Sequence, residues 1–207
     1  MLDYDREAAR YDETRGGLPR AQAAARAVRE LLPGSSPGVL SGLLPGVLPD
    51  GGTLLDVACG TGLVTRELAG DGLRVLGVDA SAGMARLAAG RVPVVLGDGR
   101  LLPVRDRSVA AVTTIWLLHL LDDARPVIAE AARVLRPGGV YVTTVDKHAA
   151  HDASVKADRQ PADRAATVIE AAARNGLRLC GETRFTGHGQ GTSGAPDPIF
   201  RLLAFTA

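Results

Sequence analysis

The chain has 207 residues, enough for one domain with a sizeable core and a small cap. Its 24 Lys and Arg residues nearly balance its 23 Asp and Glu residues, so the basic surplus of a nucleic-acid-binding surface is missing and we expect no nucleic-acid partner. No apolar run approaches a membrane span, and the acidic N-terminus has no signal core, so we expect a cytoplasmic protein without a membrane partner.

The two cysteines, Cys59 and Cys180, stand far apart without metal-ligand spacing, which favours free thiols in a reducing compartment. A composition rich in Ala, Gly and Arg but poor in Lys is typical of a GC-rich bacterial genome.

The first fifty residues are expected to form a cap or lid of helices and a flexible loop, placed before a core over residues 51–207. Residues 3–15 are polar but contain two tyrosines, and residues 20–32 carry an apolar stripe at helical spacing. Pro33-Gly34 ends that helix. The Gly-, Pro- and Ser-rich stretch that follows predicts a connector or a mobile apolar flap.

From residue 53 onward, short apolar runs alternate with amphipathic segments. The runs predict strands near 53–57, 74–78, 93–96, 109–114, 139–145, 177–184 and 199–206. The amphipathic segments predict helices near 62–70, 81–90, 123–135 and 161–174. This alternation predicts an α/β fold with a mostly parallel sheet that is covered on both faces.

Residues 54–62, Leu-Leu-Asp-Val-Ala-Cys-Gly-Thr-Gly, are the most informative stretch. An apolar run ends in an acid, breaks into a Gly-x-Gly turn and continues as a helix, so backbone N–H groups of the turn face a ligand. A second acid, Asp79, ends the next strand. Thr65 stands where the dinucleotide fingerprint has its third glycine, which disfavours a nicotinamide or nucleotide-sugar site.

The string Asp-x-Ala-Cys-Gly-Thr-Gly at 56–62 resembles motif I of the class I S-adenosylmethionine (SAM)-dependent methyltransferases. Segments that resemble later motifs of this family follow in order: Val78-Asp79-Ala80-Ser81, Gly97-Asp98-Gly99 with Leu102-Pro103, Leu118-His119-Leu120, and residues 133–139. Their order and spacing are similar to the small-molecule branch, near the ubiquinone- and menaquinone-type enzymes, over residues 51–146.

This resemblance implies a Rossmann-like, seven-stranded, mostly parallel sheet with helices on both faces, an antiparallel last strand and a long loop before it. It implies SAM as cofactor and S-adenosylhomocysteine as product. It also implies a cofactor site at the carboxyl ends of the strands. The residues predicted to bind the cofactor are Tyr11, Arg15, Asp56, Ala58, Cys59, Gly60, Asp79, Ala80, Met84, Asp98, Gly99 and Ile115.

Each acid in this set has a chemical task and a plainer alternative. Asp56 holds the ammonium group of the cofactor, directly or through water, or else fixes the glycine turn through backbone N–H groups. Asp79 accepts hydrogen bonds from the ribose hydroxyls, or caps a helix, a task that Ser81 also suits. Asp98 accepts from the adenine amine beside the Gly99 N–H, or forms an ordinary Asp-Gly turn.

Four other residues have less determined settings. Met84 packs on adenine or lies in the core. In similar methyltransferases a tyrosine-bearing N-terminal segment folds over the cofactor, which gives Tyr4 and Tyr11 a role there; the alternative is a solvated terminus. Arg15 is placed to pair with the methionine carboxylate.

Methyl transfer from a sulfonium needs alignment and desolvation, and needs a base only if the acceptor must lose a proton. His119 follows the fourth strand and is the candidate catalytic base, with a structural role as alternative. His148 and His151, near Asp146 and Asp152, indicate a polar loop at the substrate mouth, and we predict no metal. The residues predicted to contact the acceptor are Tyr4, Trp116, His148 and His188.

Trp116 is the single tryptophan, and it walls the acceptor pocket or packs in the core. His188 lies between glycines in a loop that closes over the substrate or forms a simple turn. The fourth strand ends in Thr113-Thr114-Ile115-Trp116 rather than the Asn/Asp-Pro-Pro-aromatic sequence of methyltransferases that act on amide or nucleic-acid amine nitrogens.

The leading hypothesis is methyl transfer to oxygen, nitrogen or carbon of a small molecule in bacterial secondary or quinone metabolism, by a monomer or homodimer. The alternative is a SAM-binding accessory or regulatory protein of the same fold without transferase activity.

Overall fold

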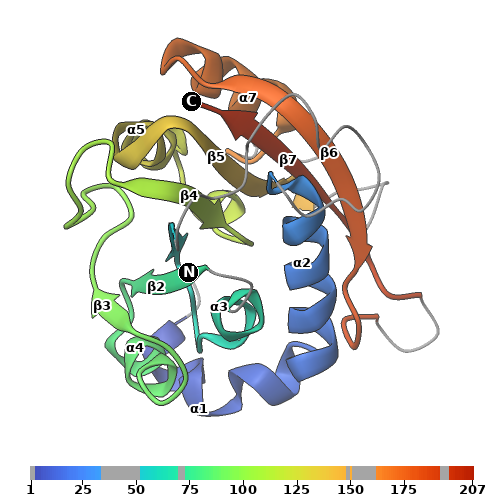
Figure 1. Cartoon of the computed structure of the whole chain (residues 1–207). Coiled ribbons are helices and arrows are strands. Elements are labelled where there is room, and N and C mark those ends of the chain that lie inside the picture. The colour runs from blue at the N-terminus through green and yellow to red at the C-terminus, as the bar shows by residue number, and fades with distance from the viewer. Residues whose placement is uncertain (1–2, 34–51, 70–72, 148–149, 151–161, 192–195) are drawn as a thin grey trace.

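The strands that the structure describes form a single seven-stranded sheet (Figure 1). The structure is a computed structural model that describes residues 3–33, 52–69, 73–147, 150, 162–191 and 196–207. The strands are β1 (Thr53–Val57), β2 (Arg74–Asp79), β3 (Val94–Leu96), β4 (Val109–Thr114), β5 (Leu135–Val145), β6 (Arg178–Thr186) and β7 (Ile199–Thr206). They lie in the order β3-β2-β1-β4-β5-β7-β6.

The five strands from β1 to β5 are mutually parallel, and β7 runs antiparallel to both β5 and β6. This arrangement confirms the predicted fold class, a mostly parallel Rossmann-like sheet with an antiparallel last strand. The order reverses at β1, where β2 and β3 lie to one side and β4 to the other. In open sheets of this kind, ligands bind beyond the carboxyl ends of the strands at that reversal.

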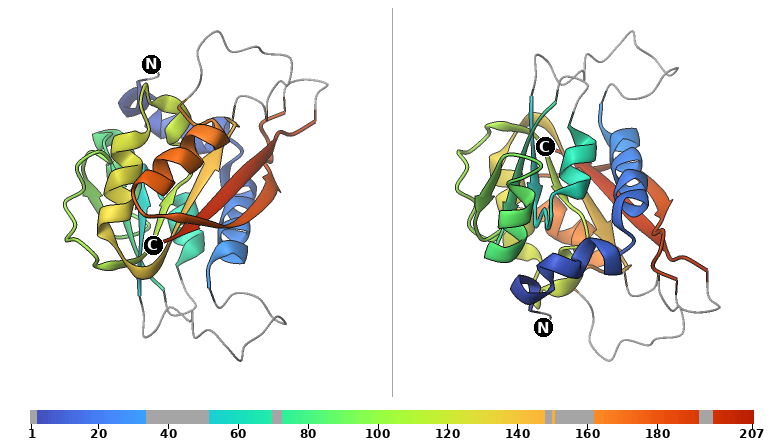
Figure 2. Two further views of the ribbon diagram at one scale, coloured as in Figure 1. Left: turned by 90° about the horizontal axis from the view of Figure 1, so that it is seen from above. Right: turned by 90° about the horizontal axis from the view of Figure 1, so that it is seen from below.

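Helices cover both faces of the sheet. They are α1 (Tyr4–Thr14), α2 (Gly17–Leu31), α3 (Leu63–Leu68), α4 (Ala82–Ala88), α5 (Arg125–Val134) and α7 (Ala165–Arg174), with a 3-10 turn at Leu118–Leu120. The views from above and below show α2 and α3 on the face opposite α5 and α7 (Figure 2).

Successive strand residues divide between two cores, one on each face. Leu54 and Val142 pack with the apolar face of α2, whereas their neighbours Leu55 and Tyr141 pack with α5 and α7. This is the period-two alternation that a strand imposes on its side chains. Because both faces are covered, the strands read as continuous apolar runs, and every residue of β4 is buried.

Several element boundaries differ from the prediction. Strand β5 begins at Leu135 rather than 139, because Leu135 pairs with Val109 across an irregularity in the register. The polar segment at 3–15 forms helix α1, with Asp3 as its N-cap. Ser81 caps α4 by accepting a hydrogen bond from the Met84 N–H, as its sequence position predicts. The predicted connector at 34–51 lies outside the described residues.

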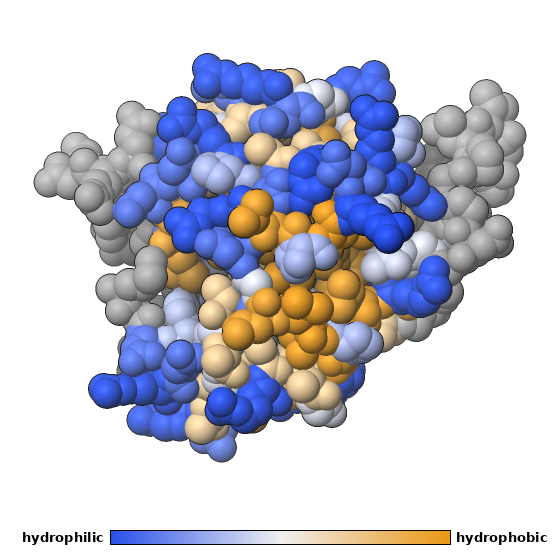
Figure 3. All heavy atoms as spheres, turned by 90° about the vertical axis from the view of Figure 1, so that its left-hand side faces the viewer, coloured by the Kyte–Doolittle hydropathy of each residue, from blue (hydrophilic) through white to orange (hydrophobic). Residues whose placement is uncertain are grey.

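The edge of the sheet at β3 carries an apolar patch (Figure 3). Exposed apolar side chains from α4, β3 and the loop after it are Leu87, Val95, Leu96 and Leu101. The strand at this edge is only three residues long, which leaves little backbone for unwanted strand pairing. Within the described part of the chain, no helix combines the length and apolar character needed to cross a membrane.

Gly62 illustrates how the fold depends on a small residue. Its φ is +79°, and a Cβ there would lie 3.1 Å from the Cβ of Ala88 in α4. Gly176 has the same φ of +79°, but a Cβ there would meet nothing within 4 Å. We predict that Gly176→Ala lowers the free energy of unfolding by about 1–2 kcal/mol from left-handed backbone strain alone.

Gly62→Ala should lower the free energy of unfolding by ~1–3 kcal/mol more than Gly176→Ala does, because the α3–α4 contact becomes overpacked. Urea denaturation of the two variants measures the difference. Equal losses would mean that α4 yields to the extra methyl group.

Candidate functional site

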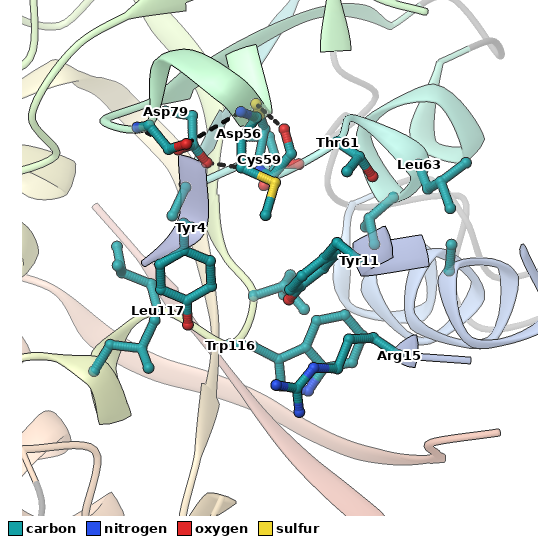
Figure 4. A pocket seen from close by; sticks show the side chains of 18 of the residues that line it. Tyr4, Tyr11, Arg15, Asp56, Cys59, Thr61, Leu63, Asp79, Trp116 and Leu117 are labelled. Atoms are coloured by element: carbon teal, nitrogen blue, oxygen red, sulfur yellow. Dashed lines mark hydrogen bonds between the residues drawn. The ribbon is translucent and has the colours of Figure 1, made fainter. Parts of the chain in front are cut away.

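A cavity of about 470 Å³ opens at the carboxyl ends of β1, β2 and β4. Its lining comes from the loops after these strands, from α1 and α2, and from Gln190 in the loop between β6 and β7. Figure 4 shows acidic side chains of the β1 and β2 ends on one side, and Trp116 with Arg15 on the other. The volume is within the ordinary range for a small-ligand pocket of about 300–1,000 Å³.

The glycine loop after β1 turns its backbone toward the cavity. Ala58, Gly60 and Gly62 all have positive φ, at 60°, 58° and 79°. The N–H groups of Cys59, Gly60 and Gly62 donate to Val78, Asp79 and Cys59, and these hydrogen bonds fix the shape of the turn. A Cβ on Gly60 would meet no protein atom within 4 Å, so this glycine keeps open space in front of the main chain. Gly60 therefore lets a ligand approach the backbone, whereas Gly62 is required for packing.

Asp79 joins the two loops that frame the cavity. One carboxylate oxygen accepts a hydrogen bond of 2.7 Å from the Gly60 N–H, and the other accepts one of 2.9 Å from the Ser81 N–H. Burial raises the pKa of this carboxyl, and the backbone N–H groups oppose that rise. Each oxygen retains a lone pair, and the residue lines the cavity.

Asp56 is buried at the end of β1 and is held by two threonines. Its carboxylate accepts hydrogen bonds from the Thr65 hydroxyl at 2.6 Å and the Thr113 hydroxyl at 2.7 Å. Burial raises the pKa of Asp56 to about 6, although both hydroxyls lower it. The hydrogen bonds come from side chains of α3 and β4 rather than from the N–H groups of the glycine turn. Thr65, which argued against a dinucleotide site, thus positions this acid.

Two other acids fasten helix α1 over the glycine loop and the start of α4. Asp5 accepts from the Ser81 hydroxyl at 2.6 Å and the Gly83 N–H at 2.7 Å. Asp12 accepts from the Thr61 hydroxyl at 2.5 Å and forms an ion pair of 2.9 Å with Arg91.

This attachment brings the two N-terminal tyrosines to the cavity. The rings of Tyr4 and Tyr11 have centroids 6.2 Å apart, both side chains line the cavity, and Figure 4 shows them between its two ends. The N-terminal segment is thus a packed helix over the site.

Trp116 forms part of the wall beyond β4. Its backbone has φ +60°, rare for a bulky side chain, and its N–H donates to the Thr144 hydroxyl at 2.7 Å. The ring packs against Phe185 and Phe200, with centroids 5.7 and 5.5 Å away, and also lines the cavity. Both settings considered for this residue, cavity wall and aromatic core, therefore occur together.

His119 lines the cavity from the 3-10 turn after β4. Its Nε2 lies 2.7 Å from the Nζ of Lys147, the second residue after β5. The pKa of Lys147 is lowered to about 8, first by burial and then by the nearby Arg20 and Arg15, while Asp163 opposes the shift. The ammonium thus loses its proton more readily than an exposed lysine.

Most of the predicted site residues meet in this one cavity. Those in its lining are Tyr4, Tyr11, Arg15, Asp56, Ala58, Cys59, Gly60, Asp79, Ala80, Met84, Ile115, Trp116 and His119. Lining residues that no sequence motif indicated include Asp12, Arg20, Lys147 and Gln190. They lie on α1, on α2, after β5 and in the β6–β7 loop, so only the fold brings them together.

Asp98, Gly99 and His188 are not in the cavity lining. The Asp98 carboxylate is engaged by the Arg100 guanidinium at 2.6–3.0 Å. Gly99 has a packing reason for its small size, because a Cβ there would lie 2.7 Å from Val57. His188 lies beside Asp197, with Nδ1 3.8 Å from the carboxylate.

His148 and His151 are outside the described residues. Their neighbour Asp146 accepts a hydrogen bond from the Ala165 N–H at 3.0 Å and another from Arg201 at 3.2 Å.

Comparison with known proteins agrees with this geometry. Residues 55–143 match a family described as "Methyltransferase domain". A demethylmenaquinone methyltransferase of Corynebacterium efficiens is 45% identical over 95 residues, which are 44% of this chain and 40% of the relative. The chain thus matches less than half the length of this curated relative.

Two solved structures share the whole fold. One is a chain of the complex between the Haloferax volcanii Trm112 methyltransferase activator and a methyltransferase, with a TM-score of 0.74, 19% identity, and coverage of 100% of this chain and 98% of the other. Another is the cyclase SpnF, with a TM-score of 0.71, 19% identity, and coverage of 98% and 93%.

The fold, the glycine loop and the family match agree with one another. Residues 55–143 match a methyltransferase domain and are similar to the corresponding part of demethylmenaquinone methyltransferases.

Asp56 makes a testable contribution to the pH dependence of stability. Its pKa of about 6 in the folded protein is above the ordinary value that applies to the unfolded chain. Between about pH 4 and pH 6 the folded state therefore binds more protons through this group, and its contribution to stability falls as the pH rises. At neutral pH Asp56 is ionised, and the full free-energy cost of burying its charge lowers the stability of the folded state.

Asp56→Asn changes the free energy of unfolding, and we compare this change at two pH values. We predict that the change is more stabilising near pH 7 than near pH 4, by about 1–3 kcal/mol. Urea unfolding of variant and wild type at the two pH values gives this difference. Asp123→Asn is the contrasting control. Because Arg125 lowers the pKa of Asp123, the change that Asp123→Asn causes in the free energy of unfolding should depend on pH in the opposite direction. A difference that does not change with pH would contradict the assignment for Asp56.

Proposed function

We propose that the protein transfers the methyl group of SAM to oxygen, nitrogen or carbon of a small-molecule acceptor. The observation that carries this proposal is the composition of the cavity. An acidic end with exposed backbone, at Gly60 and Asp79, is continuous with an aromatic and basic end at Trp116 and His119. A cofactor and an acceptor need such adjoining but chemically different surfaces.

The residues at the acidic end fit SAM. The open space before Gly60 admits a ligand to the backbone, and the free lone pairs of Asp79 suit ribose hydroxyls. Asp56 supplies negative charge near the ammonium group, and the buried thioether of Met84 offers a polarisable surface for adenine. When bound, SAM supplies a methyl group already activated by the positive sulfur. Cofactor binding by Asp98, Gly99 and the other predicted residues belongs to the same proposal.

The residues at the other end align the acceptor and exclude water. The Trp116 ring forms a fixed wall because Phe185 and Phe200 hold its edges. His119 is the base we propose where the acceptor must lose a proton; its Nε2 lies 2.7 Å from the Lys147 Nζ, and Nδ1 takes the proton in the tautomer that carries its hydrogen on Nε2. The named relative acts on demethylmenaquinone, which favours a quinone-type acceptor. Tyr4 forms part of the same surface, and contacts from His148 and His188 remain a prediction.

Other parts of the proposal rest on the sequence. We propose that residues 1–50 act as a cap on the core, that the protein works in the bacterial cytoplasm as a monomer or homodimer, and that it has no nucleic-acid partner. The near balance of 24 basic against 23 acidic residues supports the last point.

The alternative is a SAM-binding protein of this fold without transferase activity. The likeness to a cyclase shows that this fold does not fix the reaction. Incubation with methyl-labelled SAM and a panel of phenols, amines and quinols tests the two readings. Label transfer to a small molecule supports the methyltransferase, whereas SAM binding without transfer across the panel supports the accessory protein.

We predict that Asp79→Ala weakens the binding of S-adenosylhomocysteine by about tenfold or more, because charge-assisted hydrogen bonds to the ribose are lost. Isothermal titration calorimetry measures the affinity, and circular dichroism checks the fold. Asp123→Ala removes an exposed acid of the same type away from the cavity and should bind as wild type does. Unchanged affinity in Asp79→Ala would place the ribose elsewhere.

For an acceptor that must be deprotonated, we predict that His119→Ala lowers turnover by about 10²-fold or more, as loss of a positioned base does. The affinity for S-adenosylhomocysteine should stay near the wild-type value. His188→Ala is the comparison variant, because His188 is the other described histidine with a predicted acceptor contact but lies outside the cavity lining. If His188→Ala causes the larger loss, the base lies in the β6–β7 loop; if neither does, the acceptor is already nucleophilic.

A further inference from the structure

Three cationic side chains gather at the end of the cavity opposite the glycine loop. Arg15 and Arg20, at the α1–α2 corner, and Lys147, after β5, all line it. They are close enough that both arginines lower the pKa of Lys147. Within the described parts of the chain, no carboxylate lies within ion-pair distance of any of the three.

Arg20 is the most constrained of the three, with only 5% of the residue exposed. Its Nη1 donates to the Arg15 carbonyl at 2.8 Å, and its guanidinium carbon lies 3.5 Å from the centre of the Trp116 ring. Two buried donors here, Arg20 Nε and Trp116 Nε1, have no hydrogen-bond partner among the described residues. Buried donors without partners are rare in folded proteins and are costly.

Lys147 is held in place from both its ends. Its backbone N–H donates to the Asp163 carboxylate at 2.8 Å, and its Nζ lies 2.7 Å from His119 Nε2. The lysine therefore reaches the cavity beside the residue nearest to the proposed chemistry. The Asp163 carboxylate raises the pKa of this half-buried lysine, but it accepts from the backbone N–H rather than from Nζ, so an anion bound beside Nζ would further stabilise the charge.

Most of the other side chains in this region are aromatic or aliphatic, although the Tyr11 side chain hydrogen-bonds Arg20 and the polar His119 and Gln190 also line the cavity. Around the cations the cavity is lined by Tyr4, Tyr11, Trp116, Leu117, Leu120 and Leu121. Such a surface favours a ligand with a hydrophobic body, and the cations then contact a single charged group on it.

We infer that Arg20 and Lys147 form an oxyanion subsite for the methyl acceptor, which combines an apolar body with one ionised oxygen, as a carboxylate or an ionised enol or phenol. This inference rests on the proposed function and deepens it. The charges are complementary, because the acidic end faces the cationic cofactor and the basic end faces the anionic acceptor. An enolate or phenolate held there is also the nucleophilic form of its acceptor.

Calorimetry with the protein saturated in S-adenosylhomocysteine tests this subsite. The first probe pair is naphthalene carboxylate and the neutral naphthalene carboxamide of the same shape. The second pair is pentafluorophenolate, ionised at neutral pH, and neutral pentafluoroaniline. We expect each anion to bind about tenfold or more tightly than its neutral partner. The first pair reports a carboxylate and the second an ionised hydroxyl, so the two arms separate these sources.

Four variants assign the preference to residues. Arg20→Gln and Lys147→Gln should each reduce the ratio of anion affinity to neutral-partner affinity to within about threefold of unity. Arg20→Lys should keep part of this preference because the charge remains. Arg26→Gln removes an exposed charge from the same helix and should preserve it in full. Thermal unfolding confirms that each variant is folded, and Lys147→Gln decides the test if the buried Arg20 variants are not.

The outcomes separate this inference from the proposed function. Wild type that binds S-adenosylhomocysteine but shows no preference for either anion overturns the subsite and leaves the cofactor site intact. A loss of S-adenosylhomocysteine affinity in Arg20→Gln and Lys147→Gln, with the anion preference unchanged, would show that these cations hold the cofactor carboxylate instead. Failure of wild type to bind S-adenosylhomocysteine would overturn the proposed function itself.

Discussion

The Asp79 carboxylate connects the two loops on which the whole site is built. Through the N–H groups of Gly60 and Ser81 it fixes the turn after β1 against the turn after β2, at the point where the strand order reverses. Ser81 in turn caps α4 and donates to Asp5, so the same small network also fastens helix α1 over the cavity. Each hydrogen bond stabilises by only about 1–3 kcal/mol, but together they determine where the cavity walls stand.

The cavity that results is electrically divided. Carboxylates at the ends of β1 and β2 face cations carried by the α1–α2 corner and by Lys147 after β5. Neither group is neutralised within the described structure by the ion pairs that cover much of the surface. Asp56 shows the cost, since burial raises its pKa to about 6 even with two hydroxyl donors. Such uncompensated charges are what a site for a positive cofactor and a negative acceptor requires, and they lower the stability of the empty protein.

The sequence predicts the sheet and the acidic end of the cavity well, because both depend on residues that are close together in the chain. Apolar runs that end in Asp56 and Asp79 mark strands, and the glycines between mark the turn. The acceptor end is different. Arg20, Lys147 and Gln190 lie on separate elements, far apart in the chain, and therefore form no sequence motif. The sequence predicts helices in the N-terminal cap but not the bounds of the one over residues 4–14, because contacts of Asp5 and Asp12 with distant loops stabilise a segment with few apolar residues. Asp98 carries a family-like motif, yet here it pairs with Arg100 outside the cavity lining.

The central claim is that the cavity between the strand ends and helix α1 is the cofactor site. A crystal structure of the protein with S-adenosylhomocysteine tests it most directly. The account predicts the ligand in this cavity, with the ribose hydroxyls within hydrogen-bond distance of the Asp79 carboxylate and the sulfur facing the side formed by Trp116 and His119. Ligand density outside the cavity, or inside it with the ribose away from Asp79, would contradict the account.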